Sequence, residues 1–523
     1  MPSQLTVEDC AEFAKTRLQK CDTEHKNCVL PPASVFSPTR LLDLLSDSHQ
    51  IEKVKLVQDT PRASPYVALS YCWGSELHLR TTKANLSVFL NGIPFSSLPL
   101  RFQDAIRMIQ RLGIRYLWID ALCIVQDDVE DWETEAKQMG KIYACSYLTI
   151  AMTHSANNLS GFVPPRAPEL LKPPIPFTNH PITGDFEGRP FCILVHQTPI
   201  TAHSDLTSDF CPLSPLLKRG WAFQERMLSR RVLHLHTEEL VWECNTLVDC
   251  ECGSFVSDYP WEEMISPKIV ISQTRNNSAT SEAKPILWQD IIERYCRLNF
   301  TRESDRLPAL SGIAERFLEL LPSEFGNQPE GKLERYYLAG MWRDTLLHDL
   351  LWFPGDTSLR LSPPCAPTWS WASMEAPKSL YGNRHRVIID SRLEIVDAYC
   401  HLISSNRFGH VSGGLLCLEA AFLSTKFTDG QFLPESQCGD GLSFLYLDMS
   451  PDLQGIVPGD ELYVVYIGER VPLGNLAHDA HYFIVLQSLK DLFGTYRRVG
   501  VLHIVASRHR WVDDMPVQVF NIV

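Results

Sequence analysis

The sequence lacks a long uninterrupted apolar run, and this lack bounds the kind of protein it encodes. Nowhere in its 523 residues does an apolar stretch approach the roughly 20 residues that a membrane-spanning helix needs. Residues 1–20 carry scattered charges and contain no apolar core of the kind found in secretory signals. We therefore expect a cytoplasmic protein with no membrane span.

Basic charge is also scarce. The chain has 48 Lys and Arg residues against 62 Asp and Glu residues, which gives a net charge of −14. No cluster of basic residues is large enough to neutralise a run of phosphates, and such neutralisation supplies much of the affinity of proteins for nucleic acid. The sequence therefore predicts that nucleic acid is not a partner.

The motifs of several common enzyme classes are missing too. The chain contains no Gly-x-Ser-x-Gly elbow of hydrolases and no His-Glu-x-x-His helix of metalloproteases. Residues 326–333 nearly match a phosphate-binding loop, but Leu333 stands where a hydroxyl must bind magnesium, and a helical pattern precedes the loop where a strand is required. These classes lack support, and the sequence predicts no cofactor.

Cysteine is plentiful, with 16 residues at irregular spacings. In an intracellular chain of this length, most are expected to be reduced core residues and not a disulfide framework. Five metal-binding side chains do gather in one segment, namely His234, His236, Cys244, Cys250 and Cys252. Their spacings, His-x-His and then Cys-x5-Cys-x-Cys, do not follow a common zinc pattern. We therefore expect this cluster to bind no metal.

Hydrophobic patterning predicts an α/β domain. The predicted strands are residues 66–72, 116–119 and 147–152. A helical pattern over 102–112, which ends at Gly113, separates the first two strands, and a helix capped by Asp127 and Asp128 separates the last two. This order favours a largely parallel sheet covered by helices, with a crevice at the carboxyl ends of its strands.

The whole chain divides into four predicted parts. They are a lead-in at 1–60 with a helix over 7–18 and a short amphipathic stretch at 41–45, an α/β domain at 61–250 with a proline-rich insertion at 163–215, a helical region at 251–375 and a C-terminal β-rich domain at 376–523. Smaller predicted elements are a strand at 191–195, a helix at 221–229, strands at 232–236 and 240–243, and helices at 313–321 and 333–350.

Three blocks place polar side chains beside tryptophans at the ends of apolar runs. They are residues 66–74 (YVALSYCWG), 117–128 (LWIDALCIVQDD) and 219–225 (RGWAFQE). Folded domains build pockets from segments of this kind, so we expect the three blocks to meet at one edge of the sheet. The candidate substrate-binding residues are Ser70, Tyr71, Trp73, Gly74, Trp118, Gln126, Arg219 and Trp221.

The three blocks resemble, in the same order, the sequence motifs of the fungal heterokaryon-incompatibility (HET) domain. Residues 305–314 and 368–373 are similar to segments that often follow that domain. The resemblance implies an intracellular fungal protein of a family tied to non-self recognition and programmed cell death.

The HET family is thought to be distantly similar to TIR domains, which have a flavodoxin-like α/β fold. Some TIR domains cleave NAD at the nicotinamide bond with one glutamate, which lies near the start of a helix after an aromatic residue. Residues 221–225 share that layout, so the resemblance implies that Glu225 is catalytic. A carboxylate beside an indole is partly desolvated and can stabilise an oxocarbenium-like transition state. The insertion at 163–215 has no obvious TIR counterpart.

Asp120 and Cys123 complete the catalytic candidates, and every candidate also has a structural interpretation. Cys123 can act as a nucleophile only if a histidine approaches it, and it can equally be a buried inert thiol. The tryptophans can be core anchors, and Asp120 can cap a turn. Glu225 can form a structural ion pair with one of three nearby arginines, Arg219, Arg226 and Arg230.

Two classes of function remain open. The first is an effector of heterokaryon incompatibility or programmed cell death, which acts by cleaving NAD or a related nucleotide or by self-association. The second is a small-molecule biosynthetic enzyme that reuses the HET scaffold, with its pocket between the α/β domain and the C-terminal β-rich domain. The sequence does not identify the substrate.

Overall fold

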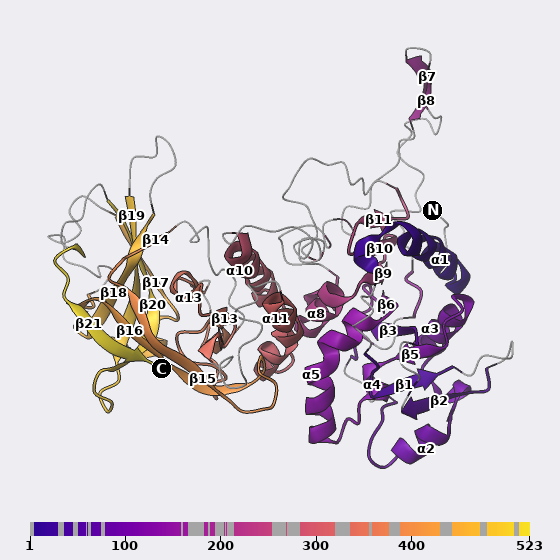
Figure 1. Cartoon of the computed structure of the whole chain (residues 1–523), viewed down its shortest axis with the longest axis horizontal. Coiled ribbons are helices and arrows are strands. Elements are labelled where there is room, and N and C mark those ends of the chain that lie inside the picture. The colour runs from indigo at the N-terminus through magenta and orange to yellow at the C-terminus, as the bar shows by residue number, and fades with distance from the viewer. Residues whose placement is uncertain are drawn as a thin grey trace. The chain divides into compact units, whose positions relative to one another are not determined.

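The computed structural model divides into two compact units, residues 1–277 and residues 278–523. It describes residues 5–29, 36–44, 51–58, 60, 64–74, 79–157, 161–165, 182–186, 189–193, 203, 206, 214–253, 268, 283–319, 335–354, 358–375, 387–428, 442–470, 479–506 and 512–523. The first unit combines helices with a sheet, whereas the second is richest in strands (Figure 1).

A nine-stranded sheet forms the centre of the first unit, in the order β11-β10-β9-β6-β3-β5-β1-β2-β4. The strands are β1 (Arg40–Asp43), β2 (Lys53–Gln58), β3 (Tyr66–Ser70), β4 (Ile93–Pro94), β5 (Tyr116–Trp118), β6 (Leu148–Ala151), β9 (Arg231–Leu235), β10 (Leu240–Cys244) and β11 (Val248–Cys250). The central strands β5, β3, β6 and β9 are buried at every residue, as expected for strands that are covered on both faces.

The middle of this sheet is parallel and doubly wound. β3 pairs in parallel with β5 on one side and with β6 on the other, and β6 pairs in parallel with β9. The prediction that the first three strands of the α/β domain are neighbours is confirmed. The order β5-β3-β6-β9 is the 2-1-3-4 order of flavodoxin-like sheets. Antiparallel pairing adds β1, β2 and β4 at one edge and β10 and β11 at the other, so the sheet is mixed and not largely parallel.

Helices cover both faces of the sheet. They are α1 (Val7–Glu24), α2 (Leu86–Asn91), α3 (Leu100–Arg111), α4 (Asp120–Cys123), α5 (Val129–Cys145) and α8 (Gly220–Leu228). The chain passes from β3 through α3 to β5 and then back through α5 to β6 on the other side of β3, so right-handed crossovers put α3 and α5 on opposite faces. α1 packs beside α3, and α8 packs beside α5. Figure 1 shows these two pairs on either side of the strands.

Local sequence explains several helix ends and one unexpected strand. Asp128 is the N-cap of α5, as predicted, and its side chain accepts a hydrogen bond from the Glu130 N–H. After α3, Gly113 takes a φ of 72°, which glycine adopts without strain. The described part of the stretch predicted at 41–45 forms most of strand β1, where Leu41 and Leu42 are buried and Leu42 lies in register with Leu117 of β5.

The segment after β6 contains a hairpin and then returns to the sheet. β7 (Ile182–Phe186) pairs with β8 (Arg189–Ile193), and β8 overlaps the strand predicted at 191–195. The chain then forms α8, β9 and β10 close to the predicted positions. The return matters for function because it brings the third block back beside β3 and β6.

An eight-stranded sheet dominates the second unit, which confirms the β-rich prediction for the C-terminal part. The strands are β14 (Ile388–Ile389), β15 (Glu394–Leu402), β16 (Val411–Lys426), β17 (Leu442–Leu447), β18 (Glu461–Arg470), β19 (Asp479–Ser488), β20 (Thr495–Ala506) and β21 (Val517–Ile522). The α-helices in the described part of this unit are α10 (Ala283–Cys296), α11 (Ser311–Leu318), α13 (Leu346–Asp349) and α15 (Pro451–Gln454).

The helix predicted over 333–350 is wrong. The described part of that segment forms a hairpin of β12 (Tyr337–Leu338) and β13 (Met341–Trp342), and only α13 is helical. Gly340 turns the hairpin with a φ of 94°, which a helix cannot contain. The apolar residues that suggested a helix belong to an aromatic core, in which the Trp342 and Trp288 ring centroids lie 5.5 Å apart.

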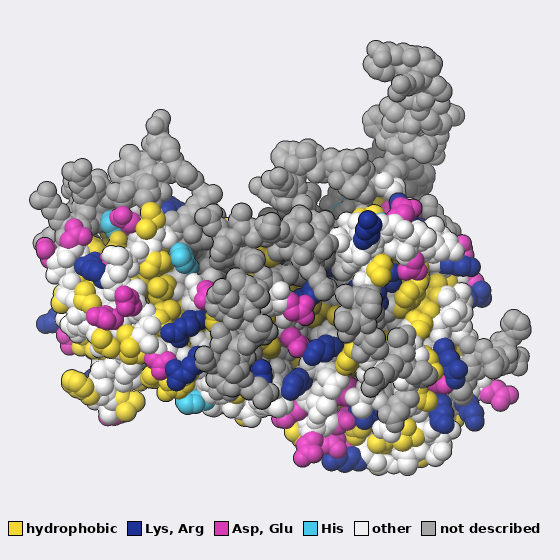
Figure 2. All heavy atoms as spheres, viewed as in Figure 1, with side chains coloured by type: hydrophobic (Ala, Val, Ile, Leu, Met, Phe, Trp, Pro, Cys, Tyr) yellow, Lys and Arg dark blue, Asp and Glu magenta, His cyan; other side chains and the backbone are white. Residues whose placement is uncertain are grey.

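The surface carries charges of both signs. On the face shown in Figure 2, Lys and Arg side chains lie among Asp and Glu side chains over the described parts of the chain. Some form exposed pairs, such as Arg107 with Asp104 at 2.6 Å. Within the described residues, no helix combines the length and the apolar character needed to cross a membrane.

Candidate functional site

The first and third blocks meet at the carboxyl end of β3. Ser70 is the last residue of β3 and lies in register with Ala151 at the end of β6. Its hydroxyl donates a 2.5 Å hydrogen bond to the carboxylate of Glu225, which lies on α8. β3 and β6 are the neighbouring strands at which the winding of the sheet reverses, and open α/β sheets bind ligands at this position. The structure thus brings Glu225 to the carboxyl edge of the sheet.

Burial raises the pKa of Glu225 from 4.5 to about 7. The hydrogen bond from Ser70 and the positive charge of Arg219 oppose this rise, and the negative charge of Asp120 adds to it. The carboxyl therefore occupies both protonation states near neutral pH. A group with this property is suited to proton transfer or to charge stabilisation at physiological pH.

Asp120 supplies a second carboxylate directly after β5. Its side chain accepts a 2.6 Å hydrogen bond from the Trp73 indole and a 2.7 Å hydrogen bond from the Ala121 N–H. Its backbone carbonyl accepts a 3.0 Å hydrogen bond from the Gln126 side chain. Burial raises the pKa of Asp120 as well, against the effect of these donors. The first and second blocks are therefore joined through this carboxylate.

Two arginines bring positive charge to the same edge. Arg219 donates a 2.6 Å hydrogen bond to the Tyr71 carbonyl. Burial tends to lower its pKa, but Cys72, Glu225 and Asp120 together raise it above the ordinary value. The buried Arg101 lies over the Tyr71 ring, 4.7 Å from the centroid, and donates a 3.2 Å hydrogen bond to the Cys72 carbonyl.

Sequence reasoning missed Arg101 and Tyr143 as parts of this site. Arg101 is a charged residue on the buried face of the amphipathic helix α3. Charged side chains are rarely buried without a partner, so this position could have indicated a buried polar site. The Tyr143 hydroxyl donates a 3.2 Å hydrogen bond to the Leu69 carbonyl, and Tyr143 also favours the ionised form of Glu225. Tyr143 lies on the buried face of α5, where the sequence indicates only a packed aromatic side chain.

Two predicted site residues lie in the core. Trp118 is fully buried and packs edge-on against Tyr143, with ring centroids 5.6 Å apart. Cys123 is fully buried, and burial raises the pKa of its thiol to about 12, so the thiol stays protonated at neutral pH. Neither side chain is exposed in this structure, and the Trp118 indole N–H has no hydrogen-bond partner there.

The remaining candidates lie nearer the surface. Trp73 and Trp221 are half-buried, and Gly74 is exposed with a φ of 78°. Trp221 packs edge-on against Trp132, with ring centroids 6.3 Å apart. Aromatic side chains that remain partly accessible beside buried carboxylates can contact a planar ring of a ligand.

The five His and Cys residues between 234 and 252 do not form one ligand set. His234 is buried between the Thr153 hydroxyl, at 3.2 Å, and the Glu243 carboxylate, at 3.1 Å. Cys244 faces His25, at 3.5 Å. The other two cysteines, Cys250 and Cys252, lie with His203 and Glu239. The segment therefore contributes to two separate groups, each completed by residues from elsewhere in the chain.

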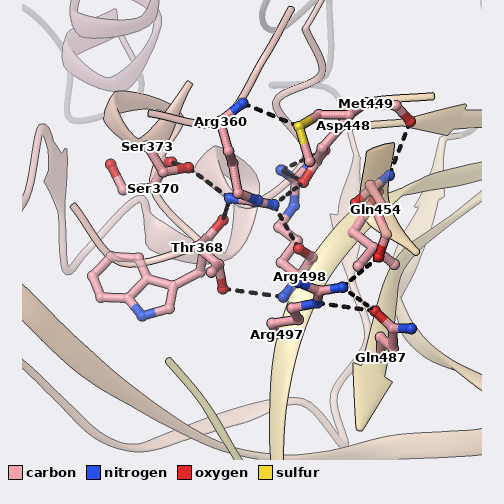
Figure 3. Close-up of polar contacts among 12 residues, drawn as sticks. Arg360, Thr368, Ser370, Ser373, Asp448, Met449, Gln454, Gln487, Arg497 and Arg498 are labelled. Atoms are coloured by element: carbon pink, nitrogen blue, oxygen red, sulfur yellow. Dashed lines mark hydrogen bonds and ion pairs between the residues drawn. The ribbon is translucent and has the colours of Figure 1, made fainter. Parts of the chain in front are cut away.

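A cavity of about 220 Å³ lies in the second unit. It is lined by Pro354, Ser358, Leu445, Tyr446, Leu447, Asp448, Met449, Ser450 and Pro451. Figure 3 shows that Asp448 binds two arginines, Arg360 at 2.9 Å and Arg498 at 2.9 Å. Arg360 also donates a 2.8 Å hydrogen bond to Ser373. Because the charges of Asp448 and the two arginines are paired with one another, the arrangement is typical of a structural network.

Comparison with known protein families finds a match within the first unit. Residues 66–225 match the family model described as Heterokaryon incompatibility protein (HET). The matched segment begins at the first residue of β3, ends at Glu225 and covers a little under a third of the chain. No curated protein and no solved structure matches the chain significantly.

Proposed function

We propose that this chain, in which residues 66–225 form a heterokaryon-incompatibility (HET) domain, is an effector of fungal incompatibility and programmed cell death. We further propose that it acts by cleaving NAD or a related nucleotide at the carboxyl edge of β3, β5 and β6. The supporting observation is the contact between Ser70 and Glu225, which places a carboxyl with a pKa of about 7 at the switch point of the sheet.

The proposed chemistry assigns roles to Glu225 and Arg219. Ionised Glu225 accepts a hydrogen bond from a ribose hydroxyl and stabilises the positive charge that develops at C1′. The bond between C1′ and the nicotinamide nitrogen breaks, and its electron pair leaves with nicotinamide. A water molecule then attacks C1′ and releases a proton, which gives ADP-ribose. Arg219 holds the negative phosphates or balances the two carboxylates.

The test is nicotinamide release by the purified full chain incubated with NAD, measured by liquid chromatography. We expect release by the wild-type protein and a loss of at least about 100-fold in Glu225→Gln, which keeps the size of the side chain and removes its charge. Glu135→Gln is the matched control, because Glu135 is also fully buried but lies 3.8 Å from Arg40, away from Ser70.

The same variants separate the proposal from the biosynthetic alternative. Induced expression in a fungal host is expected to arrest growth and lower cellular NAD with wild-type protein and with Glu135→Gln, but not with Glu225→Gln. Growth arrest that persists in folded Glu225→Gln would refute the catalytic role. A host that grows normally with unchanged NAD, while the chain converts another small molecule, would instead support the biosynthetic enzyme.

A further inference from the structure

Three thiols and one imidazole meet in the interior of the first unit. Cys21 lies in the last turn of α1, and His25 is the residue that follows the helix. Cys28 ends the short 3-10 helix η1 (Lys26–Cys28), and Cys244 ends β10. All four residues are buried, and one donor atom from each lies within 4.8 Å of the other three. The three cysteines are free thiols and form no disulfide.

This donor set is one that structural zinc sites use. Three cysteines and one histidine give four ligands, which suit the tetrahedral coordination of Zn²⁺. Zinc bonds of about 2.3 Å to sulfur and about 2.0 Å to nitrogen separate those two ligand atoms by about 3.5 Å along a tetrahedral edge. The distance between the Cys244 sulfur and the His25 Nδ1 is 3.5 Å. The pair is therefore already spaced for a shared metal ion.

Hydrogen-bond donors around two of the sulfurs favour the ionised thiolate form. The Thr246 and Leu247 N–H groups each donate a 3.4 Å hydrogen bond to the Cys244 sulfur. The Arg231 Nε donates a 3.2 Å hydrogen bond to the Cys21 sulfur. Donors of this kind orient metal ligands and stabilise their charge, whereas neutral thiols in an apolar core do not require them. Zinc with three thiolates carries one negative charge, and the guanidinium of Arg231, which also pairs with Asp22 at 2.5 Å, lies against it.

The second group of metal-binding side chains has a less suitable geometry. The sulfurs of Cys250 and Cys252 are 3.1 Å apart, closer than the about 3.8 Å edge between two sulfurs on a tetrahedral zinc. The Nε2 atom of His203 forms a 2.7 Å hydrogen bond with the Glu239 carboxylate, which uses that histidine nitrogen. His203 and Cys252 are also partly exposed. The buried group at the end of α1 is therefore the stronger candidate.

We propose that Cys21, His25, Cys28 and Cys244 bind one structural Zn²⁺ that fastens the end of α1 and η1 to β10. α1 also packs beside β10, so the proposed metal ligands come from elements that are already in contact. The site joins residues far apart in the chain, so metal binding adds directly to the free energy of folding. The proposal is independent of the chemistry assigned to Glu225.

The metal content of the full chain tests the proposal. Protein purified from a zinc-supplemented culture without a metal-affinity tag is expected to contain about one zinc per chain by elemental mass spectrometry. Cys21→Ser and Cys244→Ser are expected to lose most of it. Cys10→Ser is the matched control, since Cys10 is a buried cysteine of the same helix that lies outside the group, and it should keep the zinc. Cys252→Ser should keep it as well.

A second measurement covers the case in which the ligand variants fail to fold. Wild-type protein loaded with Co²⁺ should show the intense visible absorption of tetrahedral cobalt bound to thiolates, and chelation should lower its melting temperature. Protein without bound zinc, zinc that follows Cys252 and not Cys244, or a disulfide between Cys21 and Cys28 in the native protein would each overturn the assignment.

Discussion

The Ser70 hydroxyl and the Glu225 carboxylate form a 2.5 Å hydrogen bond across 155 positions of sequence. The bond connects the end of a central strand to a helix that returns after a long insertion. It satisfies a carboxylate that burial otherwise disfavours. The stability of the first unit and the state of its candidate catalytic group therefore depend on the same contact.

Neutralising Glu225 should stabilise the protein at alkaline pH. The folded protein keeps the proton on Glu225 up to a pKa of about 7, whereas the unfolded chain releases it near 4.5. The free energy of unfolding of the wild type therefore falls as the pH rises between these values. We expect Glu225→Gln to exceed the wild type by on the order of 2–3 kcal/mol at pH 8 and to match it near pH 4.5, measured by urea unfolding.

This gain in stability would accompany the expected loss of activity, as is common for functional residues. Glu133→Gln, at an exposed position of α5, serves as the control for the substitution itself and should change the free energy of unfolding by less than about 0.5 kcal/mol at either pH. Equal stability of Glu225→Gln and wild type at both pH values would mean that Glu225 is not held at a raised pKa.

Removing the Ser70 hydroxyl should have the opposite effect. Ser70→Ala leaves the buried carboxylate with fewer donors, so we expect the pKa of Glu225 to rise above 7 and the free energy of unfolding at pH 8 to fall by about 1–3 kcal/mol. The loss should shrink at pH 5, where the carboxyl is protonated. Ser87→Ala, at an exposed position of α2, should change stability by less than about 0.5 kcal/mol. A pH-independent effect of Ser70→Ala would contradict the coupling.

Gly340→Ala should destabilise the second unit. A Cβ at this position would lie 2.5 Å from the Trp371 ring, and the backbone φ is 94°. We expect a loss of about 2–4 kcal/mol from strain and overpacking together. Gly455→Ala separates the two causes, because Gly455 has a φ of 65° but open space around its Cβ position, and it should cost about 1 kcal/mol. Tryptophan fluorescence during denaturation measures both, and equal losses would rule out the clash.

Asp448→Asn should also destabilise the second unit. It leaves the fully buried Arg498 and the largely buried Arg360 without their shared carboxylate (Figure 3). Breaking a buried pair in this way costs about 3–5 kcal/mol. Asp397→Asn removes a partly exposed partner of Arg335 and should cost less than about 1 kcal/mol. Similar losses in the two variants would show that the buried network contributes no more than a surface pair.

Local sequence signals predicted the centre of the first unit well. Alternation over 66–72, the glycine stop at Gly113 and the cap at Asp128 each act within a few residues, so each can be recognised without knowledge of the fold. Once the parallel order was inferred, the meeting of Ser70 and Glu225 followed from the geometry of such sheets.

Features that depend on distant partners could not be predicted in this way. The apolar spacing over 333–350 is compatible with a helix, and only the packing of Trp342 against Trp288 selects the hairpin. Arginine side chains are usually exposed. Arg101 is buried, and it lies over the Tyr71 ring and donates a hydrogen bond to the Cys72 carbonyl. Cys244 was grouped with its sequence neighbours, whereas its partners lie at the end of α1.

The order of the strands in the first unit limits how the chain can be divided. β5 pairs with β1 and β6 pairs with β9, and both of these partners lie outside residues 66–225. A fragment trimmed to the region of family similarity would leave β5 without β1 and β6 without β9, and such unpaired strand edges favour aggregation. The region of family similarity is therefore not a folding unit by itself, and any shortened form of this chain needs the flanking strands β1 and β9 as well.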